Sequence, residues 1–402
     1  MSSTFGHKLR TLLRGQRQTL DAAHRALLES LHGAVWIHCA SVGEFEQART
    51  IIDRYAEGPA SPKRRPIVIT FFSPSGYEAR KNYDKADAVL YLPLATRRHA
   101  KQFLEALQPK MAIFVKYEFW PAYLKELHKR TIPTYSISAI FRPTQRFFHW
   151  YGKSSLRLLK LFTHIYVQDE DSRRLLAEHG VHNASVAGDT RFDRVKQVQS
   201  NNVQGTKDLT PIADFVEGCE RVIIAGSTWP EDEVLLSKYI AHCSSDNGNL
   251  STKLILVPHE IDEAHLHFIF NLFKGRFVRY SRATKTSMLH ANVLVIDTMG
   301  LLSSIYRFGH VAYIGGGFGV GIHNTIEAAV YGVPVIFGPN YEHFREAKGL
   351  IGIGAARSIK NYNELEAALN TALEQKEIIG PKAAAYVQSE LGATDIIYKE
   401  IF

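Results

Sequence analysis

Short apolar runs alternate with amphipathic stretches along the chain from residue 34 to residue 337. The runs are nearly continuous in Val, Ile, Leu and Phe, which is typical of parallel strands covered by helices on both faces. The first half carries the runs 34–40, 67–72, 88–92, 111–115, 133–138 and 165–168, with another short one before Gly188. The second half carries 222–225, 253–257, 293–296, 311–314 and 335–337. The pattern therefore predicts an α/β fold with two parallel sheets.

A polar stretch, VQSNNVQGTKDL at residues 198–209, separates two strand–helix series of similar size. We expect one doubly wound, Rossmann-like domain over 1–200 and a second over 201–402. The last helix, from about residue 382, is expected to cross back onto the first domain. Because ligands of doubly wound sheets bind beyond the carboxyl ends of the strands, the sequence predicts an active site in a cleft between the two domains.

Composition narrows the class of partner. The net charge of +8 favours a polyanionic partner but does not choose among nucleic acid, phospholipid and phosphorylated substrate. Three scattered cysteines without a C-x-x-C pair indicate a reduced compartment and argue against a disulfide framework or structural zinc. No apolar run reaches membrane-spanning length and no signal peptide is visible, so we expect a cytoplasmic protein that is soluble or peripheral.

The N-terminal segment FGHKLRTLLRGQRQTLDAAHRALL is basic and amphipathic. Such a segment can lie on an anionic membrane surface. It can equally form a solvated helix that packs one apolar stripe on the body of the protein, and both interpretations stay open.

Two glutamates follow expected strands of the first half. The first strand leads into SVGE, in which Ser41 and Gly43 precede Glu44 at a helix start, and the fourth strand leads into KYEFWP, which contains Glu118. A carboxylate whose pKa is raised by burial can accept a proton from an attacking hydroxyl. Glu44 is also suited to cap its helix, and Glu118 to pair with Lys116. The spacing thus leaves a catalytic and a structural role open for each.

Hydroxyls and basic residues near other strand ends suit an anionic or sugar acceptor. TFFSPSG places Ser73, Ser75 and Gly76 just past the second strand, where they also fit an ordinary turn and helix cap. SAIFRPTQRFFHWY surrounds Arg142 and Arg146 with aromatic residues. This interleaving favours a phosphorylated lipid or sugar, although it also fits single-stranded nucleic acid or a packed aromatic cluster.

The second half carries a glycine-rich turn of the kind that binds phosphate. Strand 311–314 runs into GGGFGVGIHNTIEAA, where a helix is expected to open at His323 and Asn324, with Glu327 one turn inside it. Backbone N–H groups and a helix dipole at such a turn attract phosphate. Because Glu327 is placed to accept ribose hydroxyls, the pattern favours a nucleotide sugar over a dinucleotide.

Further turns at strand ends of this half are expected to ring the same nucleotide. AGSTWPEDE is a plausible phosphate cradle, although it lacks the G-K-[ST] element of a Walker motif. The candidate donor contacts are Ser227, Thr228, Pro258, His259, Met299, Gly300, Gly316, Gly317, His323, Asn324 and Glu327. No His, Asp or Cys cluster has metal-ligand spacing, so no metal is expected.

Ten motifs, taken in order, resemble the 3-deoxy-D-manno-octulosonic acid (Kdo) transferase family of lipopolysaccharide synthesis. They are WIHCASVGEFEQ, TFFSPSGYE, YLPL, KYEFWP, GDTRFD, AGSTWPEDE, VPHE, DTMG, GGGFGVGIHNTIEAA and FGPNYEHFREA, and they extend from about residue 34 to the C-terminus. HNTIEAAVYGVPVIFGP and SVGEFEQ are the most specific.

The resemblance implies a GT-B glycosyltransferase, with two Rossmann-like domains facing each other across a cleft. Such an enzyme moves Kdo from CMP-Kdo to the lipid A precursor, with inversion at the anomeric carbon and without a metal or other cofactor. Glu44 matches the family's general base and Glu118 its second essential carboxylate. Positions that match the family's surroundings of CMP are Ser227, Thr228, Gly300, Asn324 and Glu327.

The resemblance also implies the partners and the location. CMP-Kdo, the lipid A precursor and the anionic surface of the bacterial inner membrane, on its cytoplasmic face, are the expected partners, and nucleic acid is not. Family members usually begin with an apolar anchor helix, whereas this chain starts in the basic segment that normally follows it. We therefore expect peripheral binding or an anchor absent from this chain.

A second departure concerns the donor half, where His259-Glu260 stands in place of the family's usual Arg-His.

The closest alternative function is another GT-B enzyme, such as a UDP-N-acetylglucosamine 2-epimerase. A non-catalytic membrane-binding module is a distant one.

Overall fold

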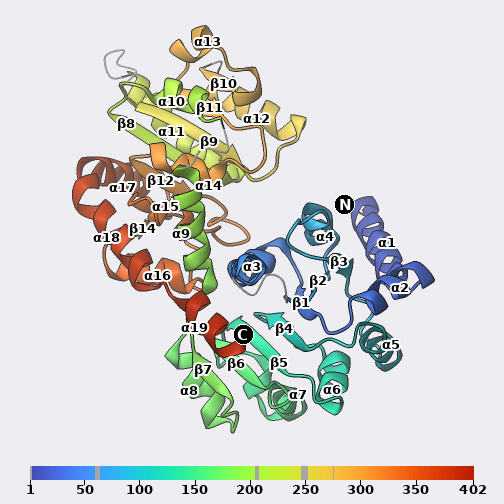
Figure 1. Cartoon of the computed structure of the whole chain (residues 1–402). Helices are drawn as coiled ribbons and strands as arrows, with labels where there is room; N and C mark the ends of the chain where they lie inside the picture. The colour runs from blue at the N-terminus through green and yellow to red at the C-terminus, as the bar shows by residue number, and fades with distance from the viewer. Residues whose placement is uncertain (1, 59–63, 204–207, 246–251, 275) are drawn as a thin grey trace. The chain divides into compact units, whose positions relative to one another are not determined.

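The computed structural model describes residues 2–58, 64–203, 208–245, 252–274 and 276–402 (Figure 1). The chain divides into two compact units, Met1–Arg194 with Leu391–Phe402, and Val195–Glu390. The boundary at Arg194 lies inside helix α9 (Thr190–Val203), and the C-terminal helix α19 (Ala393–Ile401) belongs to the first unit. Residues 198–203, expected in a polar linker, instead continue α9, because they contain no glycine or proline, and residues 204–207 of that expected linker lie outside the described residues.

The first unit is built on a parallel sheet in the order β3-β2-β1-β4-β5-β6-β7. Its strands are β1 (Val35–Cys39), β2 (Ile67–Phe71), β3 (Ala88–Tyr91), β4 (Met111–Val115), β5 (Thr134–Ala139), β6 (His164–Val167) and β7 (Ala184–Val186). Its helices besides α9 and α19 are α1 (Ser2–Gln18), α2 (Ala22–Ser30), α3 (Val42–Glu57), α4 (Pro74–Arg80), α5 (Arg97–Leu107), α6 (Pro121–Lys129), α7 (Lys153–Leu159) and α8 (Glu170–Glu178). Two short 3₁₀ turns, η2 (Arg146–Phe148) and η3 (Trp150–Gly152), precede α7.

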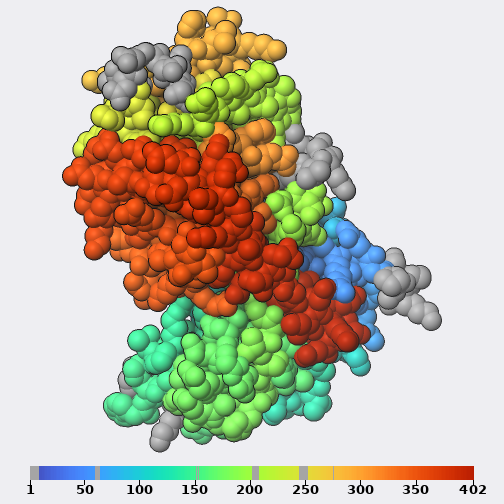
Figure 2. Space-filling view, turned by 90° about the vertical axis from the view of Figure 1, so that its left-hand side faces the viewer, coloured from blue at the N-terminus to red at the C-terminus, as the bar shows by residue number. Residues whose placement is uncertain are grey.

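The second unit repeats this plan with the order β10-β11-β9-β8-β12-β13-β14, all parallel. Its strands are β8 (Arg221–Thr228), β9 (Thr252–Pro258), β10 (Phe277–Arg279), β11 (Val293–Val295), β12 (Val311–Ile314), β13 (Val335–Phe337) and β14 (Ala356–Ser358). Its α-helices are α10 (Thr210–Val216), α11 (Pro230–Ser245), α12 (Glu263–Phe273), α13 (Lys285–Leu289), α14 (Leu302–Ile305), α15 (Ile326–Ala329), α16 (Arg345–Gly352), α17 (Tyr362–Glu374) and α18 (Lys376–Ser389), with 3₁₀ turns η4 (Tyr280–Arg282) and η5 (Tyr306–Phe308). Helices α17 and α18, in red, form part of the surface of this unit (Figure 2).

The expected fold class is confirmed, and every strand expected from an apolar run is present. Strands β10 and β14 were missed. Each is three residues long and lies at an edge of its sheet, so neither needs the continuous apolar run that marks a central strand. Central strands such as β1 are buried along their whole length, and the Trp36 ring of β1 packs against Phe103 and Phe114. Burying one such side chain contributes about 1.5–3 kcal/mol.

Candidate functional site

The two expected catalytic glutamates lie beside the point where the strand order of the first sheet reverses. Strands β1 and β4 are neighbours, but the chain leaves them toward opposite edges of the sheet. Such a switch point opens a crevice at the carboxyl ends of the strands. Glu44 follows β1 and Glu118 follows β4. The topology therefore brings together two carboxylates that are far apart in the sequence.

Glu44 lies in the first turn of α3, which the side chain of Ser41 caps. The Ser41 hydroxyl accepts the Glu44 N–H at 3.4 Å, and the Glu44 carboxylate accepts the N–H of Ala40 at 2.5 Å. The pKa of Glu44 is raised to about 7. Burial is the largest cause, and the negative charge of Glu118 raises the pKa by more than the positive charge of Lys116 lowers it. The Glu44 side chain thus binds the backbone just before the helix, whose cap is Ser41. It also has the pKa of a general base at neutral pH.

Glu118 is held by two nitrogen atoms of neighbouring rings. Its Oε2 accepts the indole N–H of Trp120 at 2.6 Å and lies 3.1 Å from Nε2 of His38. His38 is fully buried in β1, and only 12% of the Glu118 side chain is exposed. Neither His38 nor Trp120 was among the expected site residues. The signal for His38 was a polar residue inside the otherwise apolar run VWIHC.

Backbone strain marks the same end of the first sheet. Lys116, directly after β4, has φ 61°, and Ser138, near the end of β5, has φ 51°. Residues other than glycine rarely adopt this left-handed conformation, and they persist there where the surroundings enforce it, often at functional sites. The two residues show that the backbone is strained at the end of the sheet where Glu44 and Glu118 lie.

The remaining acceptor candidates divide into structural and open positions. Ser73 caps α4 by accepting the N–H of Gly76 at 3.0 Å, and Ser75 donates to Ser73 at 3.4 Å. Gly76 is required by packing, because a Cβ there would lie 2.7 Å from the ring of Phe71. Gly43 is different. It is exposed, and the nearest atom to a Cβ built on it is the Ser41 hydroxyl at 3.9 Å, so the fold itself does not require glycine there.

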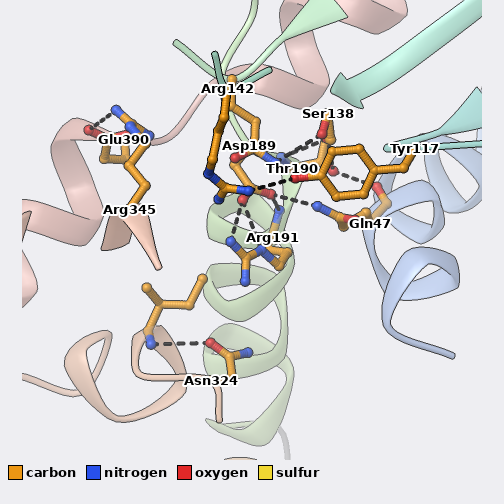
Figure 3. A network of polar contacts seen from close by, with 12 residues as sticks. Gln47, Tyr117, Ser138, Arg142, Asp189, Thr190, Arg191, Asn324, Arg345 and Glu390 are labelled. Carbon is orange, nitrogen blue, oxygen red and sulfur yellow. Dashed lines mark hydrogen bonds and ion pairs between the residues drawn. The ribbon is translucent and has the colours of Figure 1, made fainter. Parts of the chain in front are cut away.

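The two arginines of the aromatic segment lie in different surroundings. Arg142 donates to the Tyr117 hydroxyl at 3.2 Å, one residue from Glu118 (Figure 3). Arg146 is exposed in η2, with its guanidinium 5.8 Å from the centroid of the Phe147 ring. Arg142 therefore contacts the residue that precedes Glu118, and Arg146 lies on the surface.

GDTRFD binds the helix that carries Glu44. The Asp189 carboxylate accepts from Gln47 of α3 at 3.1 Å and from Arg191 at 2.8 Å, and Thr190 donates to the Gln47 carbonyl at 2.6 Å (Figure 3). Ser138 and Thr190 share a further hydrogen bond of 2.9 Å. The motif thus fixes α3 one turn beyond the candidate base.

In the second unit, the glycine turn after β12 lies at the corresponding switch point, between β8 and β12. Asp232, in the first turn of α11, ties the turn in place by accepting from Gly316 N–H at 2.9 Å, Tyr313 hydroxyl at 2.7 Å and Trp229 N–H at 3.0 Å. The sequence interpretation missed this role of Asp232.

The glycines of this turn are explained by backbone packing. A Cβ on Gly315 would lie 2.3 Å from the Ser227 carbonyl, and one on Gly317 would lie 2.6 Å from Cα of Gly338. Gly316 has φ 88° and is also packed against Gly321. The helix expected to open at His323 instead begins at Ile326 and has four residues, because the chain from Ile322 to Thr325 is not helical. The full helix dipole invoked from the sequence is therefore lacking.

The other donor candidates of β8 and β9 differ in accessibility. Ser227 has φ 55° at the end of β8, whereas Thr228 is buried and donates to Glu233 at 2.8 Å. Pro258 is the buried last residue of β9. These positions shape the carboxyl edge of the second sheet, and Thr228 has its hydroxyl already engaged.

His259 lies in a stack of three aromatic rings. Its ring centroid lies 4.8 Å from that of Trp229 and 4.5 Å from that of His323, with interplanar angles of 21° and 27°. The Trp229 indole donates to His323 at 3.3 Å. Burial, together with the His259 ring, lowers the pKa of His323 to about 4. His323 is thus a neutral ring at neutral pH, and the exposed His259 covers it.

Asn324 and Glu327 are hydrogen-bonded to each other at 2.9 Å, and the Asn324 side-chain oxygen accepts the Ile326 N–H at 3.2 Å (Figure 3). Met299 is 84% exposed, and at Gly300, with φ 84°, no atom lies within 4 Å of the place that a Cβ would occupy. The DTMG turn therefore presents an open surface, without the close packing that fixes Gly317.

The described residues were compared with the requirements of a metal site and of a membrane-spanning helix. No group of three or more His, Cys, Asp or Glu side chains is arranged to hold a metal ion within them. None of the helices in the described ranges is long and apolar enough to cross a membrane.

Known proteins are similar to this chain in sequence and in fold. Residues 11–194 match the family model described as 3-deoxy-D-manno-octulosonic-acid transferase (kdotransferase), which includes both candidate catalytic glutamates. The chain is similar to the Kdo transferase family over most of its length. A Kdo transferase of Aquifex aeolicus is 28% identical over 363 residues, covering 88% of this chain and 89% of that protein. A Kdo transferase of Rickettsia prowazekii is 26% identical and covers 92% and 78%, respectively.

A longer relative and a solved structure extend the comparison. The bifunctional glycosyltransferase/methyltransferase of Fusobacterium nucleatum is 26% identical over 91% of this chain, which spans 57% of that protein. The structure of the UDP-GlcNAc 2-epimerase of Neisseria meningitidis superposes with a TM-score of 0.66 at 17% identity, over 91% of this chain and 98% of that one. At this identity the likeness shows the shared GT-B fold alone.

Proposed function

We propose that this protein transfers Kdo from CMP-Kdo to a hydroxyl of the lipid A precursor, with inversion at the anomeric carbon and without a metal ion. The observation that carries the proposal is the partly buried pair Glu44 and Glu118 at the β1–β4 switch point, within the segment that matches the family model.

In this proposal the first unit activates the acceptor. A glucosamine hydroxyl gives its proton to Glu44, whose pKa of about 7 leaves a large ionised fraction at neutral pH while keeping it basic enough to accept a proton. The hydroxyl oxygen then attacks the anomeric carbon as the bond to CMP breaks. Glu118, fixed by Trp120 and His38, supplies negative charge near the positive charge that develops on the sugar.

The second unit holds the donor. The leaving CMP gathers negative charge on its phosphate, which needs hydrogen-bond donors in place of a metal. The backbone at Ser227, the exposed turn at Gly300 and the ring of His259 are the accessible groups near the β8–β12 switch point. Glu327, hydrogen-bonded to Asn324, is assigned to the ribose hydroxyls.

The surface of α1 supports association with an anionic membrane. Gly15 faces the body of the first unit, where a Cβ would lie 2.3 Å from the Tyr91 ring, and Thr19 donates to the Tyr91 carbonyl. Leucines and arginines point outward instead, and the exposed residues between positions 9 and 18 of the helix are Leu9, Arg10, Leu13, Arg14, Arg17 and Gln18. An apolar stripe beside a basic one suits a layer of anionic headgroups.

The test is to incubate the protein with CMP-Kdo and a tetra-acylated lipid A precursor and to weigh the product. A mass increase of one or more Kdo units is expected, with release of CMP and with full activity in a chelator. A parallel incubation with UDP-GlcNAc tests the rival 2-epimerase function, which the shared fold alone motivates. Epimerised sugar, or binding of UDP in preference to CMP, would overturn the proposal.

A further inference from the structure

A chain of buried polar groups runs from the core of the first sheet to Glu118. The Trp36 indole N–H donates to the Thr70 hydroxyl at 2.9 Å, and that hydroxyl lies 2.9 Å from Nδ1 of His38. Nε2, on the opposite side of the same imidazole, lies 3.1 Å from the Glu118 carboxylate. Trp36, Thr70 and His38 are 0% exposed, so water does not supply alternative partners to their side chains.

The chemistry of these groups fixes the direction of the chain. An indole nitrogen only donates, so the Thr70 oxygen accepts from Trp36 and its own hydrogen remains available for Nδ1 of His38. A neutral imidazole that accepts at Nδ1 carries its hydrogen on Nε2, where it faces Glu118. The opposite tautomer would donate from Nδ1 to the Thr70 carbonyl, 3.1 Å away, and would point a lone pair at the carboxylate.

The Trp120 indole is compatible with this direction. It lies 2.6 Å from Oε2 of Glu118 and 3.1 Å from Nε2 of His38, so its hydrogen has a closer and charged acceptor in the carboxylate. Nε2 is then free to carry a hydrogen of its own. Both rings donate to one oxygen of Glu118, which fixes that carboxylate in place.

We propose that His38, oriented by Thr70, is a positioning residue of the transfer reaction that holds Glu118 at its place beside Glu44. This inference rests on the proposed function. It adds to that function a relay of hydrogen bonds, from Thr70 through the tautomer of His38 to Glu118, in which Thr70 and His38 do not touch the substrate. The other titratable groups near the pair in the described part of the chain are Lys116, whose charge acts on Glu44, and the buried thiol of Cys39.

The relay has a consequence for Glu44. Because the charge of Glu118 contributes to the raised pKa of Glu44, loosening Glu118 weakens that contribution. Thr70→Val removes the hydrogen that Nδ1 accepts while keeping the shape of the side chain. We expect kcat to fall about 10-fold or more, the KM for CMP-Kdo to stay unchanged, and the titration of Glu44 to move to lower pH. Thr70→Ser keeps the hydroxyl and should behave as the wild type.

A double-mutant cycle separates the relay from a mere loss of packing. In His38→Gln the side-chain amide can donate to Glu118 whichever group occupies position 70. If Thr70 acts through the tautomer of His38, Thr70→Val has a large effect in the wild type and almost none in the His38→Gln background. An equal effect in both backgrounds would show that Thr70 serves only the fold, and would overturn the proposal.

The readout does not depend on turnover. Glutamate labelled with ¹³C at the δ-carboxyl reports the titration of Glu44 in the resting protein, and Glu44→Gln assigns its signal. Thermal unfolding of each variant confirms that the titration is measured on folded protein. A Glu44 midpoint that is the same in the wild type and in Thr70→Val would contradict the relay. If Thr70→Val shifts the titration of Glu44 as expected but the wild-type protein makes no Kdo product, the proposed function is contradicted and the relay is not.

Discussion

The carboxyl ends of the two sheets occupy equivalent places in two similar topologies, yet their acidic residues are used differently. In the second unit, Asp232 accepts three hydrogen bonds that hold the glycine turn, and Glu233 accepts from Thr228 and His265. In the first unit, Glu44 and Glu118 lie close enough that the charge of one raises the pKa of the other. Asp232 and Glu233 thus have hydrogen-bond partners inside their own unit, and the charge of Asp232 also raises the pKa of Glu233. What distinguishes Glu44 is that its pKa reaches about 7 beside a second carboxylate.

The glycines at the carboxyl ends of the two sheets also differ in how closely they are packed. Gly315 and Gly317 in the second unit are enclosed by backbone, so their small size is accounted for by the fold. Gly43 in the first unit has open space where a side chain would stand. A glycine that packing does not require leaves room for close approach by a ligand, and Gly300 in the second unit is open in the same way. We therefore place the reacting hydroxyl beside SVGE and assign the glycine-rich turn chiefly to the scaffold of the donor side.

The largest expected effect comes from Glu44→Gln, which removes the base. Transfer should fall by about 10²–10⁴-fold, the usual contribution of general-base catalysis. The rate is measured from CMP release under saturating substrates, with Glu57→Gln as the matched control on the same helix. Glu57 is exposed near the end of α3, so its variant should keep full activity. Activity of Glu44→Gln close to that of the wild type would remove Glu44 from the mechanism.

The same substitution should stabilise the folded protein at alkaline pH. The pKa of Glu44 is raised from 4.5 to about 7, so the stability that its protonated form provides is present below pH 4.5 and is lost as the pH rises through 7. Gln cannot ionise, and at pH 8 the variant should gain up to about 3 kcal/mol in the free energy of unfolding. Denaturant unfolding at pH 5 and pH 8 measures this gain in the free energy of unfolding. A variant less stable than the wild type at pH 8 would contradict the raised pKa of Glu44.

The difference between the glycines is tested by a pair of substitutions. Gly317→Ala should cost about 1–3 kcal/mol in the free energy of unfolding, because its Cβ would meet the backbone of Gly338. Gly43→Ala should leave stability within about 0.5 kcal/mol of the wild type while lowering kcat/KM for the acceptor about 10-fold or more. Thermal unfolding and steady-state kinetics on both variants give the result. Normal acceptor kinetics in Gly43→Ala would show that no ligand approaches there.

The smallest effect is expected at His259. Its ring lies exposed on the stack with Trp229 and His323, at the position where the family usually carries arginine. His259→Ala should raise the KM for CMP-Kdo about 10-fold or less, the scale of one hydrogen bond between uncharged groups, and leave kcat unchanged. His259→Arg is the companion variant, and it should restore or improve donor binding. A fall in kcat with unchanged KM would place His259 in the chemistry rather than in binding.

The sequence was sufficient for the fold and for placing Glu44 and Glu118 directly after two central strands, for a shared reason. Continuous apolar runs mark central parallel strands, and residues directly after such runs fall at the edge where parallel strands end. Edge strands β10 and β14 have no such run and were missed. The roles of His38, Thr70 and Asp232 were also beyond the sequence, because they depend on contacts between residues up to 84 positions apart.

The proposed mechanism depends above all on the pKa of Glu44, which burial and the charge of Glu118 raise to that of a base working at neutral pH. The pH dependence of kcat/KM for Kdo transfer measures this property in the working enzyme. Because the base must be unprotonated, we expect activity to fall on the acid side with a midpoint near pH 7, as the pKa of about 7 requires. A rate that stays constant from about pH 8 down to about pH 5 would contradict the assignment of Glu44 as the base.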